Sequence, residues 1–227
     1  MSNCRSLIEL PKNLWKLSNL RRLEIRGTKL IEMPEKIGSL KNLEILTSLW
    51  AKRAAQRSKL GSLSQLQGEL CISKLRNLVS PEDAAEARLE EKAGLFHLKL
   101  KWDDDNGDPK NDRDVLEQLR PPSNLGKLKI KFYGDTIFPR WLGDSSFSNM
   151  LLLHLSNCKN CLYLPPLWQL PSLQILFIEW MTAVKRVGPE FYGANKAFQS
   201  LKSLTFQGML EWEEWVSSET MGENSLA

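Results

Sequence analysis

The sequence predicts an α/β solenoid, in which short parallel strands form a concave face and irregular loops with short helices form the convex face. Two observations support this fold class. The segment Leu7–Pro11 (LIELP) recurs as Leu30–Pro34 (LIEMP), and the same offset of 23 residues relates Leu17 to Leu40. A second pattern, L-x-x-L-x-L, recurs along the whole chain. Self-similarity at a period of roughly 20 to 50 residues is typical of solenoids.

The leucine pattern identifies the strands, because it is the strand signature of a leucine-rich repeat. Its fourth and sixth positions point to the same side, since side chains alternate along a strand. One short strand cannot bury its apolar side chains alone, whereas stacked neighbours form a continuous core. The third apolar position of successive copies falls at Ile25, Ser48, Ile72, Leu100, Ile130, Leu155, Ile178 and Phe206. We therefore expect one leucine-rich-repeat domain over residues 1–227, with about eight repeats and truncated at both ends.

Some copies depart from the pattern or are longer than the others. Ser48 occupies an apolar position, and Gln67-Gly68 displaces the register of the next copy. The longer repeats have room for helices on the convex side. Ser80, followed by Pro81 and acidic residues, is typical of a helix start, because Ser caps free N–H groups and Pro fits the first turn. A second short helix is predicted over Asp112–Leu119 and is ended by the prolines that follow.

Composition excludes several classes of protein. The chain has 227 residues, 42% of them hydrophobic, and a net charge of +4, which is ordinary for a globular protein. This charge is too small to indicate a nucleic-acid partner. No apolar run approaches the roughly 18 residues of a membrane span, and no secretory signal is visible. Four scattered cysteines do not make a disulfide scaffold, so we expect a reducing, cytoplasmic location.

Two segments invite a metal interpretation. Cys158-x-x-Cys161 could be half of a zinc site or a redox pair, but zinc usually takes four ligands, and no second pair is near in sequence. Packing is favoured, with Cys158 closing the turn after its strand. Asp103–Asp108 resembles a calcium loop but lacks the Gly and Glu that such a loop requires, which favours a solvated loop. No catalytic spacing is present, so we expect no enzyme activity, no cofactor and no metal.

Candidate binding residues lie at the strand positions that alternate with the core. One copy carries His97, Lys99 and Lys101 there, and the next carries Lys127, Lys129 and Lys131. If the two strands are neighbours, five lysines form a basic band on the concave face. Charged residues on an exposed strand can serve solubility alone. Because like charges on facing strands are destabilising, the band can also indicate an acidic partner.

Farther along the same face, His154 is expected beside an apolar stretch. The stretch comprises Leu152, Ile175, Phe177 and Trp180. Exposed aromatic residues there would suit a protein-binding hot spot, and burial in an irregular repeat is the competing interpretation. Two histidines on different strands make neither a catalytic triad nor a metal site without a third partner, so we expect both to be contact residues.

Several longer segments resemble the leucine-rich-repeat region of plant disease-resistance proteins of the coiled-coil, nucleotide-binding (NB-ARC) type. They are Gly68–Ile72, Ile130–Gly134, Phe138–Asp144, Phe147–Met150, Ser156–Cys161, Leu164–Leu167, Val187–Gly193 and Glu211–Trp215. Trp168 stands where that family usually carries Gly, a departure that affects one turn. Neither a phosphate-binding loop nor coiled-coil heptads occur in this sequence, so no NB-ARC or coiled-coil domain is expected within it.

The resemblance implies a recognition module of an intracellular immune receptor in the defence response. Its partners would be a pathogen effector or a guarded host protein, together with the NB-ARC domain of the same receptor, whose switch it would restrain. A free-standing intracellular scaffold for signalling proteins is the alternative. The substrate-recognition arm of a ubiquitin ligase would require an F-box-like helical segment, which the sequence does not show.

Overall fold

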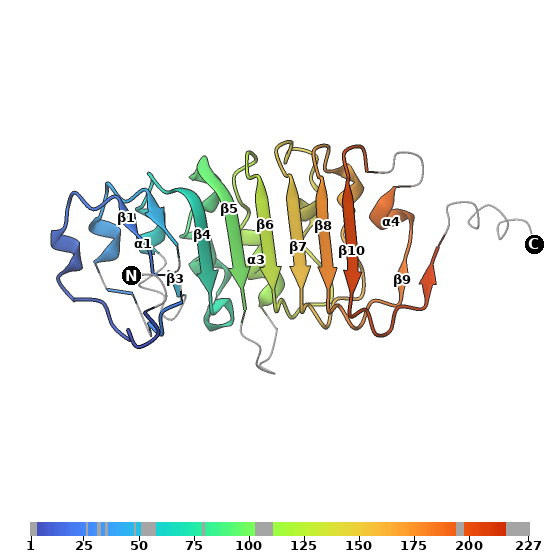
Figure 1. Cartoon of the computed structure of the whole chain (residues 1–227), viewed down its shortest axis with the longest axis horizontal. Helices are drawn as coiled ribbons and strands as arrows, with labels where there is room; N and C mark the ends of the chain where they lie inside the picture. The colour runs from blue at the N-terminus through green and yellow to red at the C-terminus, as the bar shows by residue number, and fades with distance from the viewer. Residues whose placement is uncertain are drawn as a thin grey trace, which may run out of the picture.

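A computed structural model gives the structure of the chain and describes residues 4–25, 27–30, 33–34, 36–47, 49–50, 58–78, 80–102, 111–193 and 198–216. Parallel strands form one side of an elongated molecule, and helices lie behind them (Figure 1). Between most of the described strands the chain passes through turns or short helices. The predicted α/β leucine-rich-repeat solenoid is confirmed.

The central sheet of the described chain contains seven strands, all paired in parallel. In chain order they are β3 (Leu49–Trp50), β4 (Gln67–Ser73), β5 (Gly94–Lys101), β6 (Lys127–Lys131), β7 (Leu152–Ser156), β8 (Ile175–Glu179) and β10 (Ser203–Gln207). Two further pairs stand apart from it: β1 (Arg22–Leu23) with β2 (Ile45–Leu46), and β9 (Arg186–Val187) with β11 (Glu214–Trp215). The central strands lie side by side in their sequence order, as the stacking of successive repeats requires.

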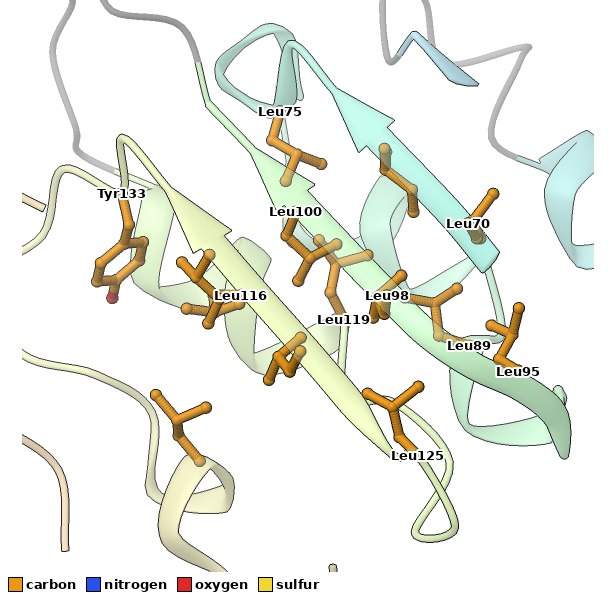
Figure 2. Packing of buried hydrophobic residues seen from close by; sticks show 14 of the residues in the cluster. Leu70, Leu75, Leu89, Leu95, Leu98, Leu100, Leu116, Leu119, Leu125 and Tyr133 are labelled. Atoms are coloured by element: carbon orange, nitrogen blue, oxygen red, sulfur yellow. The ribbon is translucent and has the colours of Figure 1, made fainter. Parts of the chain in front are cut away.

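The sheet presents two rows of inward side chains to the core. The first row is Leu70, Leu98, Leu128, Leu153 and Leu176, all buried, and ends at Leu204, which is 38% exposed; the second is Ile72, Leu100, Ile130, Leu155 and Ile178, all buried, and ends at the half-buried Phe206. The second row confirms six of the predicted third apolar positions. Figure 2 shows Leu98 and Leu100 pointing from the sheet toward Leu116 and Leu119 on the helical side. Each fully buried leucine contributes about 1.5–3 kcal/mol, so these rows are the main source of stability.

The first copies pair less regularly than the later ones. Ile25 is buried, but β1 ends at Leu23, and the Ile25 N–H donates to the Thr47 hydroxyl at 3.0 Å. Ser48 lies outside the described residues. The displaced register is confirmed, since the pairing of β4 with β5 shifts between Gly68 and Glu69.

The opposite side of the molecule carries short helices. These are α1 (Ser58–Gly61), α2 (Pro81–Ala85), α3 (Asp112–Gln118) and α4 (Pro189–Tyr192), with 3-10 turns η1 (Leu14–Lys16), η2 (Ile37–Ser39), η4 (Leu75–Asn77), η5 (Leu89–Glu91), η6 (Arg140–Gly143) and η7 (Leu167–Gln169). Both predicted helices are present. Ser80 caps α2 by accepting the N–H of Asp83 at 3.4 Å, and Pro81 lies in the first turn. The α3 helix begins at the predicted Asp112 and ends one residue early, at Gln118.

A residue in the left-handed conformation turns the chain off the sheet after several strands. Phe132, Asn157 and Trp180 have φ of 59°, 58° and 56°. Their N–H groups donate to the last carbonyl of the next strand, at 3.0, 2.8 and 2.7 Å. Cys158 follows this turn, is buried, and points its thiol at the Ser156 carbonyl 3.6 Å away, a position that suits turn closure.

Asp112, the first residue of α3, is a buried carboxylate that connects three segments of the array. Its Oδ2 accepts the N–H of Gly134 at 2.9 Å and lies 3.7 Å from Nη2 of Arg76. Arg76 belongs to η4, which follows β4, and Gly134 follows β6. Burial raises the pKa of Asp112 from 3.8 to about 6, although the Gly134 N–H and the Arg76 charge both act to lower it.

Candidate functional site

The outward side chains of the central sheet form a continuous surface, which we call the strand face. The register arranges them in three rows across β4, β5, β6, β7 and β8. The rows are Glu69, His97, Lys127, Leu152 and Ile175; Cys71, Lys99, Lys129, His154 and Phe177; and Ser73, Lys101, Lys131, Ser156 and Glu179. The strand face thus brings together the predicted binding residues, with the exception of Trp180.

The centre of the strand face is basic. Lys99 and Lys101 of β5 lie directly opposite Lys129 and Lys131 of β6, and Lys127 lies opposite His97. The predicted adjacency of these two strands is therefore confirmed. We call Lys99, Lys101, Lys127, Lys129 and Lys131 the lysine block. All five side chains are half-buried.

The lysine block forms no direct ion pair within the described parts of the chain, although the charge of Glu179 acts on Lys131. There, none of its ammonium groups lies within 4.0 Å of a carboxylate. Burial, and next the charge of Lys99, lower the pKa of Lys131. Like charges directly opposite one another on neighbouring strands are destabilising.

Two corners of the lysine block are held by aromatic rings. Nζ of Lys101 lies 5.4 Å from the centre of the Phe132 ring, and Nζ of Lys127 lies 5.5 Å from that of Phe96. Phe96 is the residue of β5 left without a partner where the register shifts, and it is 46% exposed. Its ring lies against Gly126, where an added Cβ would be 2.1 Å from Phe96 Cε2. Gly126 therefore provides the space in which the Phe96 ring lies under the Lys127 ammonium.

Each histidine of the strand face contacts a glutamate beside the lysine block. Nδ1 of His97 lies 3.7 Å from Oε2 of Glu69 on β4, and Nε2 of His154 lies 2.8 Å from Oε2 of Glu179 on β8. Burial lowers the pKa of His154, although the hydrogen bond and charge of Glu179 oppose this. One of these glutamates, Glu69, is on the strand next to β5, whereas Glu179 is separated from β6 by β7.

An apolar stretch adjoins the lysine block on β7 and β8. Leu152, Ile175 and Phe177 are half-buried, and the Phe177 ring centre lies 5.3 Å from that of His154. Trp180 is 42% exposed, but it follows β8 in the left-handed conformation. Its indole lies against Gly208, where an added Cβ would be 2.4 Å from Trp180 Cε3. Phe177 thus lies on the strand face, whereas Trp180 lies at its rim.

Sequence reasoning missed four residues of this surface. Glu69, Phe96, Phe132 and Glu179 all contact predicted site residues. Ile175, Phe177 and Glu179 are alternate residues of β8, so the pattern that places the first two on the strand face also predicts Glu179 there. The register shift at Gly68 was predicted, but the leucine pattern does not show that Phe96 is the residue of β5 that the shift leaves without a partner.

The described chain has cavities away from the strand face. One cavity of about 600 Å³ is lined in part by Arg120, Asp144 and Tyr163, and another of about 530 Å³ in part by Arg186 and Glu190. Neither is lined by a residue of the strand face. Within the described ranges, no three His, Cys, Asp or Glu side chains gather closely enough to hold a metal ion. The calcium-like segment 103–108 falls outside those ranges.

None of the described helices is both long enough and apolar enough to cross a bilayer.

The repeats, their parallel sheet and the exposed strand face define a leucine-rich-repeat solenoid, a class that presents extended binding surfaces. Residues 58–181 match the family model described as R13L1/DRL21 LRRs, and the chain belongs to this family. It is 40% identical over 168 residues to an Arabidopsis thaliana protein named as a "putative disease resistance protein", and 37% identical over 168 residues to "Putative disease resistance RPP13-like protein 1" of the same species. It is also 36% identical over 122 residues to disease resistance protein RGA2 of Solanum bulbocastanum.

These relatives are much longer than the chain. The matched stretches cover 68%, 66% and 52% of this chain but 12%, 16% and 12% of the respective relatives. Among solved structures, a leucine-rich-repeat protein of Leptospira interrogans aligns with a TM-score of 0.46 and 20% identity, covering 81% of this chain and 46% of that chain.

Proposed function

We propose that the chain is the protein-recognition module of an intracellular plant immune receptor and that it binds its partner on the strand face. The lysine block is the observation on which this proposal rests. Membership of a family whose relatives are plant disease resistance proteins supports the defence role. We place the module in the cytoplasm, with a protein as its ligand and without catalysis, cofactor or nucleic acid.

The composition of the strand face suits an acidic protein surface. The lysines on β5 and β6 would steer and pair with carboxylates, since complementary charge speeds and orients association. Leu152, Ile175 and Phe177 would add apolar area that is removed from water on binding, which favours association. An acidic surface of this kind could belong to a pathogen effector, to a guarded host protein or to the NB-ARC domain of the same receptor.

The proposal is tested by reversing charge in the lysine block. In the full-length receptor, Lys127→Glu with Lys129→Glu is compared with Lys12→Glu and Lys29→Glu, two exposed lysines outside the block. The readouts are cell death in leaf tissue, with and without the pathogen, and affinity for the NB-ARC domain. We expect the block variant to change the resting state or the response, and the control to match the parent. Identical behaviour of both variants and the parent would overturn the proposal.

A further inference from the structure

We infer that the lysine block takes an extended acidic segment of a partner protein, with carboxylates at alternate residues, lying along β5 and β6. This inference rests on the proposed function, because it specifies the partner of the same strand face. It follows from the spacing of the lysines, the width of the block and the charges beside it.

The spacing of the lysines matches that of an extended chain. Lys127, Lys129 and Lys131 are alternate residues of β6, and Lys99 and Lys101 are alternate residues of β5. Alternate side chains of a strand are about 6.5 Å apart. A ligand in the extended conformation has the same repeat, so acidic residues at its first, third and fifth positions present carboxylates to three successive lysines. Lysines of the neighbouring strand, about 4.8 Å away, reach the same carboxylates from the side.

The direction of the ligand follows from the same dimensions. A segment crossing the strands at a right angle would meet lysines about 4.8 Å apart, and only two strands carry them. Its alternate residues, about 6.5 Å apart, would leave the block after one step. A segment lying along the strands keeps three carboxylates over lysines. The parallel orientation therefore satisfies more charges.

The charges near the block favour a ligand that stays over β5 and β6. Glu69 lies on β4, directly beside β5, whereas Glu179 lies on β8 and is separated from β6 by β7. A ligand carboxylate displaced toward β4 would approach Glu69 and be repelled, while carboxylates over β5 and β6 face only lysines and His97.

Aromatic contacts restrict the positions of two of the lysine side chains. The spacing of their ammonium groups is therefore better defined than that of unrestrained lysines. Lys127 is held by Phe96 at one end of the block, and Lys101 is held by Phe132 at the other. These two residues lie at opposite corners, on neighbouring strands. A cation over a ring at an exposed site is restrained by about 0.5–1 kcal/mol. The ammonium groups at the two corners are therefore positioned before a ligand arrives.

The test compares two peptides of equal composition and charge. SETETES places three glutamates on one face of an extended chain, whereas STEEETS places two on one face and one on the other. Each is titrated into the isotopically labelled 227-residue chain at low salt, with amide shifts on β5 and β6 followed by NMR. We expect SETETES to bind about two- to fivefold more tightly, the effect of one additional exposed ion pair. Lys129→Glu should remove this preference, and Lys12→Glu should keep it.

Several results would overturn the inference while leaving the broader proposal open to its own test in the full-length receptor. If the two peptides bind with equal affinity and neither binds the Lys129→Glu variant, the block recognises negative charge but not the spacing of the carboxylates. If neither peptide binds at low salt, an extended acidic segment is not the ligand of the block. Tighter binding of tripolyphosphate or single-stranded DNA than of SETETES would identify a general polyanion surface.

Discussion

Asp112 makes the stability of the fold depend on pH in an unusual direction. Its carboxylate is 4% exposed, and burial raises its pKa from 3.8 to about 6. Each pKa unit corresponds to about 1.4 kcal/mol, so the charged form costs the fold roughly 3 kcal/mol at neutral pH. Between the two pKa values the folded chain binds more protons than the unfolded chain. The free energy of unfolding contributed by this group therefore falls as pH rises through that window.

The expected size of the effect can be measured by urea unfolding at pH 7 and pH 5. Over this interval Asp112 should add about 1 kcal/mol of stability on acidification, since most of its protonation in the folded state occurs there. Asp112→Asn keeps an acceptor for the Gly134 N–H but does not titrate, so this gain should disappear in the variant. Asp114→Asn, which changes an exposed carboxylate two residues away, should keep it. If the parent and Asp112→Asn respond equally to pH, the buried carboxylate does not titrate as argued.

Two further predictions concern packing. Leu153→Asp should unfold the array, because Leu153 is fully buried between Leu128 and Leu176. Truncating such a leucine costs about 2–5 kcal/mol, and an unpaired buried charge adds several more. Circular dichroism with thermal melting checks this prediction. A variant with the Tm of the parent would show that the inward register is wrong. Gly126→Ala should lower stability by about 1–2 kcal/mol, since Phe96 must move and Lys127 loses its ring contact. The same melt measures it, and an unchanged Tm would mean that the ring shifts without cost.

The sequence predicts the core of this molecule well because the core repeats. The leucine spacing determines which residues point inward, and Ile72 to Phe206 fall in one continuous row as expected. The adjacency of Lys99 and Lys129 follows directly, since successive repeats lie side by side. Helix caps depend only on residues close together in the sequence, so the start of α2 after its N-cap Ser80 is also predictable.

Features that depend on departures from the repeat were not predictable. The register shift beside Gly68 was predicted, but the resulting contact of Phe96 with Lys127 was not, because it depends on the missing side chain of Gly126. The sequence predicts Trp180 on the strand face. Trp180 instead follows β8 in the left-handed conformation, which directs it to the rim. The burial of Asp112 depends on how α3 packs between Arg76 and Gly134, which are distant in sequence. The binding roles of the strand-face residues stay predictions.

The parallel register has a consequence for how such a surface can be rebuilt. If residues 102–131 were excised, β7 would come to lie against β5, with Leu98 facing Leu153 and Leu100 facing Leu155. The hydrophobic layer would still match leucine with leucine, because β5 and β7 both carry leucine at these two depths. On the outside, Lys99 would instead face His154. Exchange of whole units by recombination can therefore reshuffle recognition chemistry in one step while leaving the interior interchangeable.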